Sequence, residues 1–186
     1  MSVIAVTGIA GAGKTTILKA ALEMAAEEYV VVNYGDAMLK AAKAEHLKNR
    51  DELRKLPSST QKKIQRQAAQ AIAGKAKNSS IIVDTHCTIK TPSGYLPGLP
   101  IWVLEALKPE KFVLIEADPL EIIDRRIKDE SRIRDAEVAA NIEEHQQMNR
   151  AISMALAVLT GATIKIIKNH KDKLEDAVEE LVATLR

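Results

Sequence analysis

The residue types best suited to chemistry lie near the start of the chain, in a glycine-rich stretch that ends in lysine and threonine. Residues 8–15 read Gly-Ile-Ala-Gly-Ala-Gly-Lys-Thr, which satisfies the phosphate-loop pattern G-x-x-x-x-G-K-[ST]. Its glycines let backbone N–H groups converge on a polyphosphate, and Lys14 adds a mobile positive charge for the outer phosphates. The Thr15 hydroxyl is suited to coordinate Mg²⁺. A glycine-rich turn without a ligand is the alternative, disfavoured because an apolar run precedes the pattern and a stretch free of glycine and proline follows it.

A carboxylate that could serve the same site ends another apolar run. Asp84 follows residues 81–83, Ile-Ile-Val, at the carboxyl end of a predicted strand. In a phosphate-loop protein a carboxylate placed there holds Mg²⁺ through water or orients Thr15. The alternative is that Asp84 only caps the turn that follows.

Arginines gather in one short segment of the second half. Four of them fall within ten positions: Arg125, Arg126, Arg132 and Arg134. Phosphoryl transfer needs charge neutralisation around the moving group, which a cluster of this kind on a mobile segment would supply. The alternative is a solvated face on which these arginines pair with neighbouring carboxylates, namely Asp129, Glu130 and Asp135.

Four further side chains admit two readings each. Arg54 lies in a helical, charged stretch and would suit a second substrate's phosphate. His86 and Cys87 lack the spaced partners that a metal or nucleophile site requires, and Cys87 is expected to be a small buried residue. Trp102 is predicted to be a core residue rather than a platform on which a base stacks.

The elements that would position these residues alternate between strands and helices. Five short apolar runs predict strands, at residues 3–6, 29–34, 81–83, 112–117 and 163–167. Helical composition fills the intervals, with a helix beginning near Lys14, another whose first residue is Pro119, and a long one over residues 136–159 that ends at Gly161. Residues 85–100, with three prolines and two glycines, predict an ordered loop. The pattern predicts an α/β fold: one domain with a five-stranded parallel sheet, helices on both faces, and the ligand at the carboxyl ends of the strands.

Composition sets limits on the partners. The 186 residues hold 27 basic and 25 acidic side chains, a net charge of +2, which argues against a broad surface for nucleic acid or membrane. A single cysteine excludes an internal disulfide and fits a reducing compartment. With no apolar run approaching a membrane span, we expect a cytoplasmic protein.

Taken together, these motifs resemble the nucleoside monophosphate kinases, and specifically the archaeal type of adenylate kinase. The segments that carry the resemblance are residues 8–16, 33–38, 84–86 with 91–100, 129–135, and 161–163. They span nearly the whole chain, and the proline-rich loop after Asp84 is the most particular of them.

The resemblance implies reversible phosphoryl transfer from Mg-ATP to AMP, giving two ADP, by a homotrimer whose core carries two flaps. The AMP-binding insert is then residues 35–77 and the lid residues 128–135, with Arg132 and Arg134 reaching the transferring phosphate beside Lys14. By the same resemblance, the residues that bind ATP are Gly8, Ile9, Ala10, Gly11, Ala12, Gly13, Lys14, Thr15, Thr16, Arg125 and Arg126. Those expected near AMP are Gly35, Asp36, Met38, Arg54 and His86.

The sequence also departs from this family pattern. Bacterial and eukaryotic relatives place a Gly-Phe-Pro-Arg run after the third strand, where this chain has Thr85-His86-Cys87, so His86 and Lys90 are candidates for the second AMP phosphate ligand. The lid is short and lacks a zinc-type cysteine set. Two other functions remain open at this point: a kinase acting on another nucleoside monophosphate, and an ATP-dependent switch or binding module.

Overall fold

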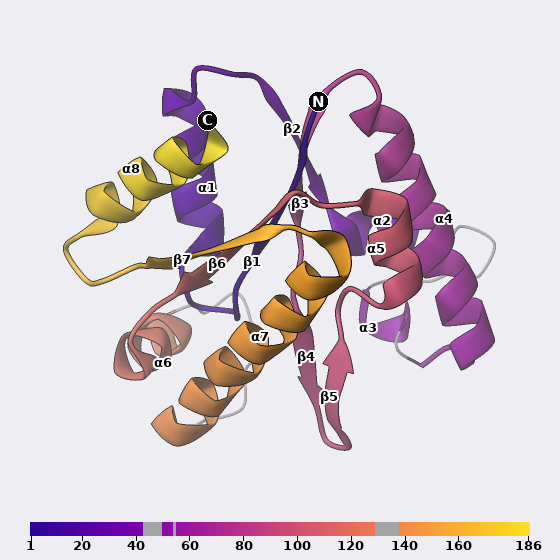
Figure 1. Cartoon of the computed structure of the whole chain (residues 1–186). Coiled ribbons are helices and arrows are strands. Elements are labelled where there is room, and N and C mark those ends of the chain that lie inside the picture. Colours follow the sequence, from indigo (N-terminus) through magenta and orange to yellow (C-terminus); the bar gives the residue numbers. More distant parts are fainter. Residues whose placement is uncertain (43–49, 54, 129–137) are drawn as a thin grey trace.

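The computed structural model of the chain describes residues 1–42, 50–53, 55–128 and 138–186 (Figure 1). Five parallel strands form its central sheet in the order β2-β3-β1-β6-β7. They are β1 (Val3–Thr7), β2 (Tyr29–Asn33), β3 (Ser80–Asp84), β6 (Lys111–Glu116) and β7 (Thr163–Lys168). The five predicted strands and their parallel arrangement are therefore confirmed.

Helices cover both faces of the sheet. The set comprises α1 (Lys14–Met24), α2 (Tyr34–Ala41), α3 (Arg50–Leu53), α4 (Ser58–Ala76), α5 (Ile101–Leu107), α6 (Pro119–Lys128), α7 (Ala139–Thr160) and α8 (Leu174–Leu185). The predicted start at Pro119 is confirmed, as is the end of α7 at Gly161, whose φ of 73° is the left-handed conformation typical of a helix C-cap. Of the predicted first residues of the long helix, 136 and 137 lie outside the described residues.

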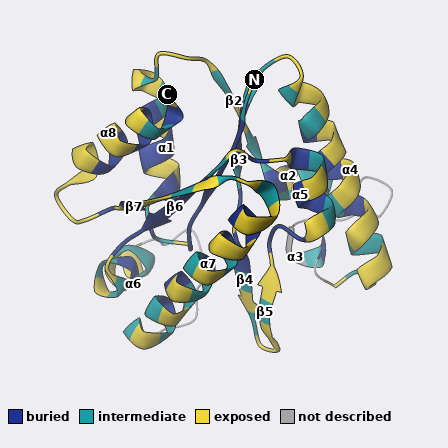
Figure 2. Ribbon diagram, in the orientation of Figure 1, coloured by how far each residue is buried: buried dark blue, intermediate teal, exposed yellow. Residues whose placement is uncertain are grey.

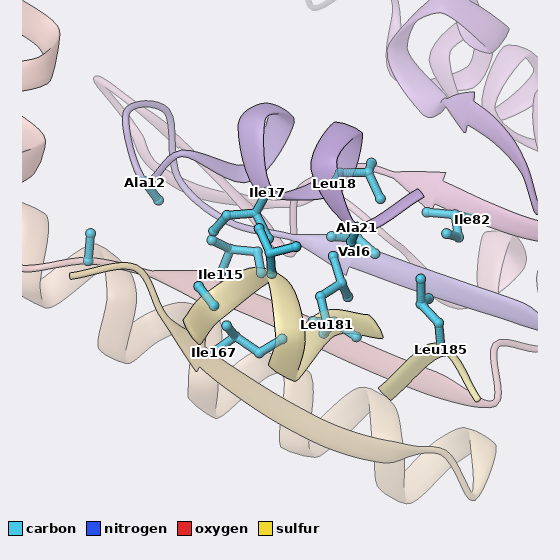
Figure 3. Packing of buried hydrophobic residues seen from close by; sticks show 14 of the residues in the cluster. Val6, Ala12, Ile17, Leu18, Ala21, Ile82, Ile115, Ile167, Leu181 and Leu185 are labelled. Carbon is cyan, nitrogen blue, oxygen red and sulfur yellow. The ribbon is translucent and has the colours of Figure 1, made fainter. Parts of the chain in front are cut away.

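The central strand β1 shows why the sheet is covered on both sides. All five of its residues are buried, because successive side chains enter opposite layers. Ile4 and Val6 pack with α1 and α8 in one core, whereas Val3 and Ala5 pack with α4 and α5 in the other. Figure 2 shows the buried residues concentrated along the central strands, and Figure 3 shows Ile17 and Leu181 meeting between α1 and α8.

One fold prediction was wrong. The segment 85–100, expected to be a loop, contains the antiparallel hairpin β4 (Thr88–Thr91) and β5 (Gly94–Pro97). Gly94, with a φ of 119°, permits the tight turn between the two strands. Figure 1 shows the hairpin projecting below the sheet, beyond the carboxyl ends of β1 and β3, where it can form a wall for a site. Among the described residues, no helix is long and apolar enough to cross a membrane.

Candidate functional site

The phosphate loop connects β1 to α1 and needs glycine where other atoms approach closely. A Cβ on Gly8 would lie 2.6 Å from the backbone oxygen of Ile115, and one on Gly13 would lie 2.1 Å from Asn169 Nδ2. Gly13 also adopts a φ of 89° directly before Lys14, the first residue of α1. The backbone is thus held in the curled form that directs N–H groups and the helix N-terminus at an anion.

Lys14 and Asp84, which the sequence assigns to one site, are in contact. The Lys14 ammonium forms an ion pair with Asp84 and donates a hydrogen bond to the Thr85 backbone oxygen at 2.8 Å. The other carboxylate oxygen of Asp84 accepts from Asn33 Nδ2 at 2.8 Å. Thr15 is exposed on the first turn of α1. Within the described residues Asp84 forms hydrogen bonds with Lys14 and Asn33 and not with Thr15. The ends of β2 and β3 therefore hold the lysine in place.

Both arginines of α6 contact the outside of the phosphate loop. Arg125 Nη1 lies 3.4 Å from the backbone oxygens of Gly11 and Ala12, and Arg126 Nε donates to the backbone oxygen of Ala10 at 2.9 Å. These guanidinium groups therefore brace the loop through its backbone carbonyls. Arg125 and Arg126, which were predicted to bind ATP, thus lie against the loop, and their contact with ATP stays a prediction.

A pocket of about 300 Å³ opens beside the loop, between the hairpin and helices α2, α4 and α5. Three of the residues expected near AMP line it: Gly35, Met38 and His86. Asp84 lines it as well, so the pocket reaches the partner of Lys14. Asp36 does not; its backbone N–H is capped by Asn33 Oδ1 at 3.2 Å, and the residue lines a separate hollow beside β2.

His86 joins the pocket to the phosphate loop. Its Nδ1 lies 2.9 Å from the backbone oxygen of Gly8. Since a carbonyl can only accept, Nδ1 carries the hydrogen. Desolvation by the surrounding protein atoms, followed by the charge of Lys14, lowers the pKa of His86 to about 4, although the residue remains exposed at the pocket mouth. The ring is therefore neutral at pH 7.

Other predicted site residues fall outside the described part of the chain. These are Arg54, Arg132 and Arg134, together with the proposed lid carboxylates Asp129, Glu130 and Asp135. Among the described residues, no group of three or more His, Cys, Asp or Glu side chains could hold a metal ion.

Comparison with known proteins places this geometry in a family. A family model described as an AAA domain matches residues 7–144. The chain is 60% identical to an adenylate kinase of Methanopyrus kandleri, covering 99% of this chain and 97% of that protein. It is 55% identical to one of Methanothermobacter thermautotrophicus, with both chains covered completely. The chain belongs to the adenylate kinase family.

Solved structures support the fold of this adenylate kinase family member. The structure of TT1252 from Thermus thermophilus matches with a TM-score of 0.60 at 13% identity, covering 100% of this chain and 98% of that one. An unliganded sugar kinase from Janibacter matches with a TM-score of 0.54 at 16% identity, over 100% and 94%. At such low identity these matches speak for the fold alone.

Two residues that support the phosphate loop of this adenylate kinase family member were missed from the sequence. Asn169, directly after β7, donates from Nδ2 to the Ala12 backbone oxygen at 2.8 Å, and its backbone oxygen accepts from Arg125 at 3.1 Å. Asn33, the last residue of β2, donates a hydrogen bond to Asp84. Both follow the same signal that identified Asp84, a polar side chain at the carboxyl end of a parallel strand.

The wall of the pocket that α4 and α5 form was also missed. Gln65 and Lys62 on α4 and Trp102 on α5 line it, and Trp102 Nε1 donates to Gln65 Oε1 at 3.0 Å. Trp102 packs against the second core and is only partly buried, so the prediction of a core residue describes one side of its ring. No sequence signal links these residues, because their contact joins two helices that are distant in the chain.

Proposed function

We propose that this chain catalyses the reversible transfer of a phosphoryl group from Mg-ATP to AMP, giving two ADP. The observation that carries the proposal is the position of Asp84, which contacts the phosphate-loop lysine and lines the neighbouring pocket. Donor and acceptor phosphates would then meet at one point, and positioning is the main requirement of phosphoryl transfer.

In this mechanism the residues of the chain supply charge and orientation. Lys14 leaves Asp84 for the donor phosphates and neutralises the charge that develops on the transferred group. Arg125 and Arg126 hold the loop from outside. Arg132 and Arg134, in a lid formed by residues 128–135, add further positive charge around the same group. No general base is required.

The donor set suits Mg²⁺ bound together with the nucleotide. Thr15 and Asp84 offer oxygen ligands, which Mg²⁺ prefers, and a site that relies on substrate phosphates needs only one or two protein ligands. Held by Thr15 and Asp84, the ion would supply positive charge that offsets the charge of the phosphates. Asp84 is available to it through water once Lys14 has moved to the phosphates.

The acceptor side is the pocket together with the insert of residues 35–77. Gly35 and Met38 line it, and His86 stands where it borders the phosphate loop. We assign Arg54 to the AMP phosphate, with His86 or Lys90 as the second phosphate ligand. We assign no AMP contact to Asp36, whose backbone N–H is bound by Asn33 at the start of α2.

A coupled assay for ADP tests this function. ADP should form only when ATP, AMP and Mg²⁺ are all present, and the reverse reaction should convert ADP into ATP and AMP. Faster transfer to CMP, UMP or GMP than to AMP would indicate a different nucleoside monophosphate kinase. ATP loss that is unchanged by AMP would instead indicate a switch or binding module.

Family resemblance further supports a homotrimer in the cytoplasm that binds neither nucleic acid nor membrane. Light scattering of the purified chain measures the first point: three times the 20.3 kDa chain mass is expected. A mass of one chain would exclude the trimer.

A further inference from the structure

The wall of the pocket that α4 and α5 form carries a polar group of fixed orientation. Trp102 Nε1 donates to Gln65 Oε1 at 3.0 Å. An indole nitrogen can only donate, so the oxygen of the Gln65 carboxamide must face Trp102. The NH₂ group of Gln65 therefore points away from the indole and is presented as a donor.

Contacts around this pair hold it in place. The buried Tyr34 hydroxyl donates to the Gln65 backbone oxygen at 3.1 Å, and burial raises the pKa of Tyr34, which keeps that hydroxyl a donor. Lys62 Nζ lies 4.6 Å from the centroid of the Trp102 ring, a cation–π contact that covers the indole. Gln65, Lys62 and Trp102 all line the pocket.

The Gln65 NH₂ group has no hydrogen-bond partner within the part of the chain that the structure describes. Gln65 on α4 lines the same pocket as Asp84 and His86, which border the phosphate loop. A nucleotide whose phosphate lies at the loop would place its base among the other lining residues, and Gln65 is one of them. Because the Gln65 NH₂ group is held as a donor, it requires an acceptor atom on that base. A base that turned a donor toward Gln65 would leave its own donor and the Gln65 NH₂ group without hydrogen bonds.

We propose that Gln65, oriented by Trp102, selects the acceptor base by donating a hydrogen bond to the unprotonated N1 of adenine. This inference rests on the proposed function, because it assumes that the pocket binds a nucleoside monophosphate. Hypoxanthine and guanine carry a hydrogen on N1, so both would place a donor against the Gln65 NH₂ group. Gln65 is thus a specificity-determining residue and Trp102 its positioning residue.

The test uses atom-deleted substrates with a conservative variant. With the wild-type chain, replacing AMP by 1-deaza-AMP should raise KM about 3- to 10-fold, the effect of one neutral hydrogen bond, whereas 7-deaza-AMP should change it little. In Gln65→Glu, which keeps an oxygen for Trp102 but loses the donor, AMP and 1-deaza-AMP should have similar KM values. Gln70→Glu, an exposed position on the same helix, is the matched control and should behave as the wild type.

A second variant tests the orientation without altering Gln65. Trp102→Phe removes the indole donor, so the Gln65 carboxamide can rotate and offer its oxygen to the N1 hydrogen of IMP. The preference for AMP over IMP should fall several-fold, with turnover on AMP largely kept and melting curves recording any loss of folding.

Two results overturn the proposal: an equal KM penalty for 1-deaza-AMP in the wild type and in Gln65→Glu, or an unchanged AMP-to-IMP preference in Trp102→Phe. Neither is confused with failure of the proposed function, which would appear as a wild-type chain that makes no ADP from AMP and ATP.

Discussion

Lys14 illustrates how a residue of the site also contributes to the fold. Its ammonium contacts Asp84 and the Thr85 backbone oxygen, and the residue is only 9% exposed. Replacing Lys14 by Met should lower turnover by about 100-fold or more, because a preorganised charge on the reacting phosphates is lost. Steady-state kinetics with saturating ATP and AMP measure this.

Among the described residues, the same substitution leaves Asp84 with Asn33 as its hydrogen-bond partner and without a positive charge, so the melting temperature should also fall. Lys14→Met combined with Asp84→Asn should recover stability without recovering turnover. Lys19→Met, at an exposed position of α1, provides the control. Turnover of Lys14→Met within a few-fold of the wild type would remove Lys14 from the mechanism.

The proposed role of Arg132 and Arg134 makes a contrasting prediction, since it assigns both residues to the transition state. Arg132→Ala and Arg134→Ala should each lower turnover about 100-fold with a smaller change in ATP affinity. Lysine at either position should rescue poorly, because it keeps the charge but loses the planar fork. Kinetics and melting curves of the four variants decide the matter: normal turnover with a lowered melting temperature would show a structural ion-pair network instead.

At the scale of elements, α7 fastens the hairpin to the rest of the molecule. Asn149 Oδ1 accepts hydrogen bonds from both the backbone N–H and the hydroxyl of Thr88, at 3.1 and 2.5 Å. Asn149→Ala should cost about 1–3 kcal/mol of stability, since the two buried donors of Thr88 lose their acceptor. It should also raise the KM for AMP more than that for ATP, because the hairpin lines the acceptor pocket.

Asn149→Asp is the matched variant, because it keeps an acceptor oxygen for Thr88 and should restore part of both effects. Gln147→Ala, at an exposed position of the same helix, should change neither quantity. Equal changes in the two KM values of Asn149→Ala would argue that the hairpin does not belong to the acceptor site.

The strand end of β6 is joined to α7 and β7 through one carboxylate. Burial favours a raised pKa for Glu116, but hydrogen bonds from Arg150 and Lys168 outweigh it, so the pKa is lowered below 4.5. The unfolded chain therefore binds more protons than the folded chain at acid pH, and this stabilisation is present above 4.5 and lost as the pH falls through the lowered pKa.

Glu116→Gln should accordingly cost about 2 kcal/mol near pH 7 and progressively less as the pH falls below 4.5. Thermal unfolding across that range is the measurement. For Glu105→Gln, at an exposed position of α5, the difference in stability from the wild type should not change with pH. A difference between Glu116→Gln and the wild type that stays constant with pH would contradict the assignment of the acid-sensitive stability to Glu116.

These elements also show where sequence reasoning succeeds. Uninterrupted apolar runs such as Phe112 to Ile115 reveal strands buried on both faces, and polar residues at strand ends reveal Asp84. The hairpin was missed because its strands are four residues long and contain or adjoin Pro92 and Pro97, which read as loop residues. The contact of Gln65 with Trp102 was missed because it depends on how two helices pack, which periodicity does not record.

At the scale of the whole molecule, the phosphate loop and the pocket proposed for the acceptor border the same group of atoms. Asp84 lines the pocket and forms an ion pair with Lys14 of the phosphate loop. His86 also lines the pocket and contacts the Gly8 backbone oxygen. One molecule carrying two adenosines on a single polyphosphate could therefore occupy both sites, whereas ATP or AMP alone fills one. Such a ligand avoids the entropy loss of binding a second molecule.

We expect this bisubstrate dinucleotide to raise the melting temperature more than ATP and AMP added together at the same concentrations. At 100 times its dissociation constant the stabilisation is about 2.7 kcal/mol, which corresponds to roughly 5–10 °C for a chain of this size. Lys14→Met should reduce this shift because the polyphosphate loses a contact at the loop, and Gln65→Glu should reduce it because one adenine loses a contact in the pocket. Gln70→Glu should leave the shift unchanged. A shift no larger than that given by ATP alone would mean that the pocket beside the loop is not the acceptor site, because the second adenosine would then contribute nothing to binding.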